Sequence, residues 1–144
     1  MSELTMSKAT REAFLADVHV GVFCVNRTDD APLATPVWYL YEPGGDVQVI
    51  VGKHSQKADL VRAAGVASFC AQSESMPYRF VTVEGPAVLE EGDGGLTYEM
   101  AERYLGPEGA RGYVEQSSGF ESCVVHITPK RWRTNDYSSW DPST

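Results

Sequence analysis

The segment with the clearest potential for chemistry runs from residue 51 to residue 60 and reads VGKHSQKADL. A strand end passes through Gly52 into a helix that Ser55 can cap, with Lys53 and Lys57 beside the first turn. The N–H groups at a helix start lack intrahelical partners and the macrodipole is positive there, so a phosphate can be held by the helix end, the Ser55 hydroxyl and both ammonium groups. In the alternative interpretation, Ser55 is only an N-cap and both lysines are solvated. The residues by themselves leave both interpretations open.

Other signatures of catalysis are missing from the sequence. It contains no G-x-S-x-G, H-E-x-x-H or P-loop motif, so no catalytic residue and no metal ligand is assigned. The three histidines are widely separated, which favours packed or surface side chains over a shared site. Each cysteine lies in an apolar, strand-like run without paired metal-ligand spacing, which predicts reduced core residues. The histidines are His19, His54 and His126, and the cysteines are Cys24, Cys70 and Cys123.

Length and charge narrow the class of protein. A chain of 144 residues with 42% hydrophobic residues is expected to form one domain with its own core. The formal net charge of −8 disfavours a nucleic acid or an anionic membrane as partner, because both attract positive surfaces. No apolar stretch approaches the roughly 20 residues of a membrane span. Residues 1–8 show no basic stretch leading into an apolar one, so no secretory signal is predicted and a cytoplasmic location is expected.

Local patterns place the elements that must position these residues. Extended runs rich in β-branched and aromatic residues predict six strands, at 18–26, 33–41, 47–51, 66–72, 78–89 and 122–128, the fifth bent near Gly85 and Pro86. Short turns between the first three strands predict a meander. Helices are expected within 1–17, at 55–64 and at 93–105, and residues 129–144 read as a polar tail. The result is a single mainly β domain, a closed or partly closed antiparallel barrel with short helices.

Three stretches carry a resemblance to a known family. They are ATPVWY at 34–39, SQKADL at 55–60 and YRFVTVEGPA at 78–87, and their order and spacing extend the likeness over roughly residues 14–128. The sequence resembles the pyridoxamine 5′-phosphate oxidase-like split barrels, which bind FMN or the deazaflavin coenzyme F420. This resemblance implies a six-stranded antiparallel split β-barrel of the FMN-binding type and a homodimer, with Trp38 and Trp132 as candidate interface residues.

The resemblance also implies a set of cofactor-binding residues. The strand with Thr35, Pro36, Val37 and Trp38 would lie along the edge of the isoalloxazine ring. The motif Ser55, Gln56 and Lys57 would bind the phosphate at a dimer interface, with Lys57 as the main cation. Gln56 stands where a second cation is common, so Lys53 is expected to assist. Tyr78 and Arg79 would reach the cofactor from a later strand.

The function implied is that of an F420-dependent oxidoreductase. It would transfer a hydride between F420 and a planar organic substrate, and the protein would supply orientation and electrostatics. F420 is placed before FMN because its glutamate tail needs further cations, which Lys130, Arg131 and Arg133 would offer unless they are simply solvated. The alternatives are an FMN-binding oxidoreductase and a non-enzymatic carrier of F420, flavin or haem. A haem carrier would need an axial ligand such as His54 or His126.

Overall fold

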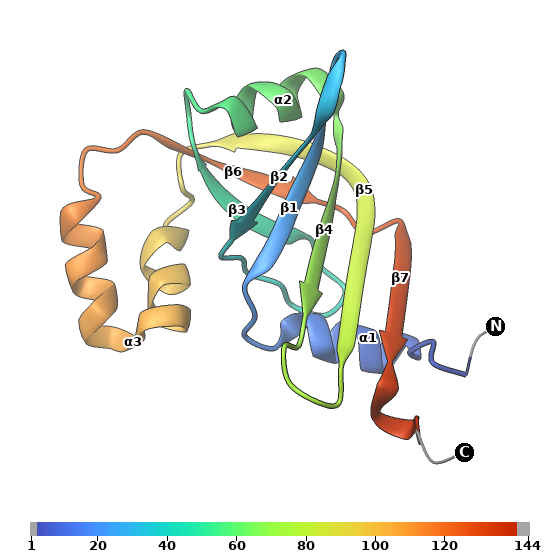
Figure 1. The fold of residues 1–144 in the computed structure, drawn as a ribbon. Helices are drawn as coiled ribbons and strands as arrows, with labels where there is room; N and C mark the ends of the chain where they lie inside the picture. Colours follow the sequence, from blue (N-terminus) through green and yellow to red (C-terminus); the bar gives the residue numbers. More distant parts are fainter. Residues whose placement is uncertain (1–2, 141–144) are drawn as a thin grey trace.

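A curled antiparallel sheet forms the centre of the computed structural model, which describes residues 3–140 (Figure 1). Its strands within that range are β1 (Gly21–Arg27), β2 (Asp30–Val37), β3 (Val47–Gly52), β4 (Val66–Gln72), β5 (Arg79–Glu91), β6 (Ser122–Ile127) and β7 (Arg131–Asp136). Six of them follow the order β2-β1-β4-β5-β6-β3, and β7 pairs with β5 away from this path. The mainly β, antiparallel fold class is therefore confirmed.

Helices occupy the two ends of the sheet and one of its sides (Figure 1). The hydroxyl of Ser7 accepts a hydrogen bond from the Thr10 N–H and so caps the first helix. Gly65, with φ of 70°, ends the second helix in the left-handed conformation that glycine adopts at little cost. At Gly106, with φ of 78°, the third helix turns sharply into a second segment. The helices are α1 (Lys8–Ala16), α2 (Gln56–Ala64) and α3 (Leu96–Gln116), and a 3-10 turn spans Tyr137–Ser139.

The core lies on the concave side of the sheet. Along β1, β4 and β5, buried side chains alternate with more exposed ones, as expected for strands with one covered face. Phe23, Phe69, Val81 and Val83 are fully buried there. Cys123 is buried as predicted, whereas Cys24 and Cys70 are only half-buried, so the prediction of core positions was wrong for these two. No described helix is long and apolar enough to cross a membrane.

Long β5 joins the two halves of the sheet. Residues up to Pro86 pair with β4, and residues from Ala87 onward pair with β6. The change of partner falls between Pro86 and Ala87, next to the bend expected near Gly85 and Pro86 from the sequence. There the connection from β6 to β7 crosses β5, with the N–H of Lys130 donating to the Glu84 carbonyl at 2.9 Å and the N–H of Thr128 donating to the Pro86 carbonyl at 3.0 Å.

Two sequence-based expectations were wrong about this sheet. The first three strands do not form a meander, because β3 pairs with β6 and touches the segment after β2 only through an isolated bridge of Leu40 with Gln48. The polar tail contains β7, which pairs with the first half of β5 over residues 131–136. Main-chain hydrogen bonds build such an edge strand, so its polar side chains gave no signal for it. Residues 141–144 of that tail lie outside the described residues.

Candidate functional site

The start of α2 has the geometry of a capped helix. The Ser55 hydroxyl accepts from the Ala58 N–H at 3.2 Å and donates to the Gly52 carbonyl at 2.7 Å. Its only proton is therefore committed within the chain, as in the interpretation of Ser55 as an N-cap. The main-chain N–H groups of Gln56 and Lys57 belong to the first turn, where helices leave donors for a ligand.

The two lysines beside this turn differ in their surroundings. Lys53 Nζ lies 3.8 Å from the carboxylate of Glu91, so its charge is already partly balanced. Lys57 is half-buried and forms no salt bridge with any described residue. It lines a cavity of about 210 Å³ instead. Of the two, Lys57 is thus the cation left free for an anionic ligand.

This cavity brings together four of the residues predicted from the sequence. Pro36, Val37 and Trp38, at the end of β2, share its wall with Lys57. A second hollow of about 350 Å³ adjoins it at the same three residues. We call the two together the Lys57 cavity. Its remaining lining residues are Val20, Ile50, Thr97, Met100, Ala101 and Tyr113.

Two tyrosines of α3 hold Trp38 in place. The Trp38 ring stacks on Tyr104, with centroids 4.9 Å apart and planes at 6°, and packs against Tyr113 at 5.4 Å. The Tyr104 hydroxyl donates to the His19 carbonyl at 2.6 Å and accepts from the Tyr39 N–H at 3.1 Å. Sequence reasoning placed Tyr104 on the apolar face of a helix but assigned neither tyrosine to the site, because only the fold brings α3 against residue 38.

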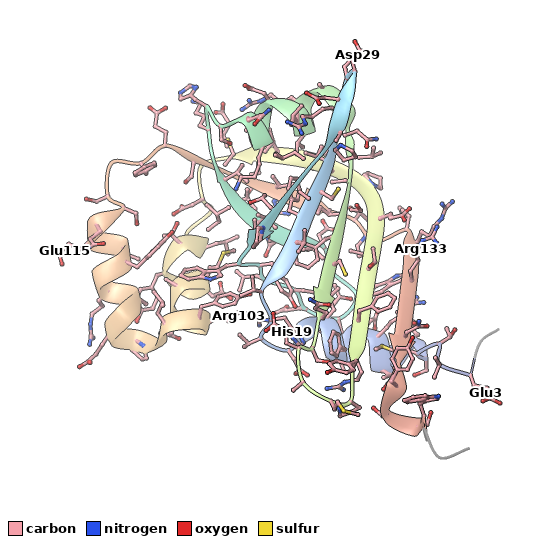
Figure 2. All side chains as sticks on the ribbon, viewed as in Figure 1. Glu3, His19, Asp29, Arg103, Glu115 and Arg133 are labelled. Atoms are coloured by element: carbon pink, nitrogen blue, oxygen red, sulfur yellow. The ribbon has the colours of Figure 1, made fainter. Side chains whose placement is uncertain are left out.

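Arg103, the neighbour of Tyr104, connects the same helix to the end of α1. Its guanidinium donates to the carbonyls of Ala16 and Asp17 at 3.0 and 2.7 Å. Figure 2 shows Arg103 on the side of α3 that faces the barrel, whereas Glu115, in the second segment of the helix, points away from it. The first segment of α3 is thus anchored to the C-terminal end of α1.

The comparisons with known proteins agree with this architecture. No protein-family model matches the sequence, and no curated protein matches it significantly. A conserved hypothetical protein from Mycobacterium tuberculosis, Rv2991, superposes with a TM-score of 0.78 at 25% identity, over 95% of this chain and 89% of its own. A provisionally assigned pyridoxamine 5′-phosphate oxidase from Listeria innocua gives 0.63 at 22% identity, over 88% and 96%. An F420 reductase gives 0.67 at 18% identity, over 85% and 94%.

The chain has the split-barrel fold of these solved structures. Its six-strand path agrees with the fold that the resemblance implied, whereas the cofactor contacts implied for residues 34–39 and 55–60 stay predictions.

The split barrel keeps Tyr78 and Arg79 away from Lys57 within one chain. They lie at the start of β5, beside α1, at the opposite end of the sheet from α2 (Figure 1). The Arg79 guanidinium lies over the Phe14 ring, 5.0 Å from its centroid. Tyr78 is exposed, and its carbonyl accepts from the Tyr137 N–H. Their role in cofactor binding stays a prediction, as does that of Thr35, which lies half-buried on β2 next to the cavity.

The basic residues of β7 also lie apart from the Lys57 cavity. Arg131 and Arg133 both pair with Glu84, at 3.7 and 3.4 Å. With Lys130, Arg131 borders a separate hollow of about 450 Å³ at residues 24, 66–68 and 84 of the sheet. Contact of these cations with a cofactor tail therefore stays a prediction.

The histidines considered for haem ligation are both engaged with carboxylates. Exposed His54 lies 3.1 Å from Glu121, and half-buried His126 lies 3.7 Å from Glu90. Neither lines the Lys57 cavity. Within residues 3–140, no group of three or more potential ligands is placed to hold a metal ion.

Proposed function

We propose that this split barrel binds a flavin-type cofactor, with F420 in first place and FMN as the alternative, and acts as an oxidoreductase on a planar organic substrate. The observation that carries the proposal is the shared cavity of Lys57 and Trp38. The F420 reductase with the same fold supports the choice of F420. Such a cofactor supplies a ring atom that accepts or donates a hydride.

The residues present fit such a group in two parts. A phosphate is suited to the first turn of α2, where the N–H groups of Gln56 and Lys57 have no partner within the helix and the Lys57 ammonium would add a positive charge. A planar ring is suited to the apolar wall of Pro36, Val37 and Trp38. The two adjoining hollows, of about 210 and 350 Å³, together fall in the size range of small-molecule sites. In this arrangement the chain orients the ring and excludes water from one face.

Lys57→Ala is expected to weaken the binding of F420 and of FMN by about tenfold to hundredfold, because a hydrogen bond to a charged group is lost. Titration of each cofactor into the purified protein, followed by its absorbance or fluorescence, measures this. Lys8→Ala is the matched control, since Lys8 is exposed on α1 at the other end of the sheet. Unchanged affinity in Lys57→Ala would show that the cofactor phosphate does not bind at this site.

A turnover assay distinguishes an enzyme from a protein that only carries the cofactor. Reduced F420 is offered to the protein together with a quinone, and reoxidation of F420 is followed by absorbance. Tight binding without any reoxidation across a panel of planar acceptors would identify a carrier instead. A cytoplasmic location stays a prediction.

We further propose that two copies pair through the outer face of β1, β2 and β4. Val22 and Val66 on this face are 40% and 50% exposed, although valine is among the residues most often buried. Pro36 of β2 is exposed too and also lines the Lys57 cavity, so a second copy on this face would close the cavity on one side. Trp38 and Trp132 pack within the chain, and their part in an interface stays a prediction.

Val22→Asp is expected to weaken this dimer by about hundredfold or more, because it buries an unpaired charge between the copies. Light scattering coupled to gel filtration, run over a dilution series, reports the change. Val88→Asp adds the same charge at a position on β5 that is 60% exposed and pairs with β6, so it should leave the dimer intact. If the dimer dissociates to the same extent in both variants, or in neither, an interface at Val22 is contradicted.

A further inference from the structure

A second cavity lies beside the Lys57 cavity, between α3 and the edge formed by β3 and β6. It has a volume of about 610 Å³, which falls within the range of small-molecule sites. Ile50, Thr97 and Tyr113 line both it and the Lys57 cavity, so the two spaces are neighbours across a common wall. We call this space the Phe120 cavity, after the aromatic residue in the loop that follows α3.

The Phe120 cavity exposes aromatic surface to water. Phe120 is 79% exposed and Tyr113 is 42% exposed, and both line the cavity. Exposure of such rings forgoes the gain from burying apolar area, and that gain becomes available when a ligand covers them. Aromatic rings bind other rings by offset or edge-on stacking. The lining therefore favours a flat, conjugated ligand over a flexible polar one.

The lining of the Phe120 cavity carries a negative charge. Asp93 is the sole charged residue among the described residues that line the cavity. Its carboxylate accepts hydrogen bonds from the Thr97 hydroxyl and the Gly95 N–H. The bond from Thr97, followed by that from Gly95, lowers the Asp93 pKa below its usual value, so the group is ionised at neutral pH. The Asp93 carboxylate therefore repels an anionic ligand and attracts a cation or a hydrogen-bond donor.

We propose that the Phe120 cavity is the substrate site, and that the substrate is a planar conjugated molecule without negative charge, carrying an amino, hydroxyl or cationic group that faces Asp93. The assignment as substrate rests on the proposed function, because the cavity adjoins the space given to the cofactor ring. The charges of the two spaces are opposite, with Lys57 in one and Asp93 in the other. Each space thus selects a different ligand, and an anionic cofactor is kept out of the substrate side.

The test uses two fluorescent probes of similar shape and opposite charge, 9-aminoacridine as cation and acridine-9-carboxylate as anion. Binding is measured on the protein without cofactor. The cation is expected to bind about tenfold more tightly than the anion, and Asp93→Asn is expected to reduce this preference to about twofold or less. Asp29→Asn makes the same change of charge at the distant tip of the β1–β2 hairpin (Figure 2) and should preserve the preference.

Phe120→Ala tests the aromatic wall separately. It is expected to weaken both probes by about fivefold, whereas Tyr98→Ala, at an exposed residue of α3 outside the lining, should weaken neither. Phe120 lies in an exposed loop, so its loss leaves the core intact, and an unchanged melting temperature verifies this. Equal affinity for the two acridines, or identical behaviour of Phe120→Ala and Tyr98→Ala, would overturn the proposal.

These measurements are independent of the cofactor. If the acridines behave as expected but neither F420 nor FMN binds, the proposed oxidoreductase function fails while the planar-ligand site stands. If a cofactor binds through Lys57 but the acridines show no charge preference, the substrate site fails alone.

Discussion

Replacing Gly85 by alanine is expected to destabilise the fold by roughly 3 to 5 kcal/mol, the sum of overpacking at a main-chain contact and the loss of adjacent hydrogen bonds. A Cβ atom at residue 85 would lie 1.8 Å from the carbonyl oxygen of Thr128 and 2.9 Å from its carbonyl carbon. Both are main-chain atoms, so no side-chain rotation can relieve the contact.

The position of Gly85 explains the size of this effect. The chain crosses over it between β6 and β7, and main-chain bonds fix the crossing on either side, from Lys130 to Glu84 and from Thr128 to Pro86. Room for a methyl group has to come from moving β6, β7 or the bend of β5. A loss of 3 to 5 kcal/mol is a large share of the 5 to 15 kcal/mol that typically stabilises a domain.

Equilibrium unfolding in urea measures the loss, and Gly112→Ala is the matched control. Gly112 lies within α3, its φ is not positive, and a Cβ there has no neighbour within 4 Å. Alanine is the better helix former, so this control should gain about 0.5 to 1 kcal/mol. Wild-type stability in Gly85→Ala would show that the crossing is looser than the structure indicates.

Local signals in the sequence were sufficient for parts of the fold. The N-cap Ser55 and the stop at Gly65 defined α2, and β4 was predicted with the bounds that the structure has. Each of these signals acts over a few neighbouring residues. The pairing of β3 with β6 joins residues 70 to 80 positions apart, and nothing in either strand identifies its partner. The short turn at residues 42–46 indicated that the third strand continues a meander, but only the isolated bridge of Leu40 with Gln48 pairs the chain across it.

The site was predictable to the same extent. Trp38 and Lys57 were named from motifs, and the fold places them on one cavity. The residues of α3 were missed because an aromatic residue on a helix face usually belongs to a core. The sequence predicted that this helix begins at residue 93, but Gly95 stands at the N-cap position and Asp93 lines the Phe120 cavity. Which face of a helix meets a ligand depends on tertiary packing, which no local pattern contains.

Tyr104→Ala is expected to lower the free energy of unfolding by about 2 to 4 kcal/mol and to weaken cofactor binding by at least about tenfold. The substitution removes the ring that stacks on Trp38 and the hydroxyl that bridges His19 and Tyr39. Without that ring, Trp38 keeps only the tilted contact with Tyr113. Its indole is then free to leave the wall of the Lys57 cavity.

Tyr104→Phe separates the two effects, because it keeps the stacked ring and deletes only the hydroxyl. The Tyr39 N–H and the His19 carbonyl then lose their partner, which costs about 1 to 3 kcal/mol of stability. Cofactor affinity should stay within about threefold of wild type, since Trp38 is still held in plane. Urea unfolding and cofactor titration of both variants provide the comparison. If Tyr104→Phe weakens the cofactor as much as Tyr104→Ala, the hydroxyl network, and not the stacking, positions Trp38.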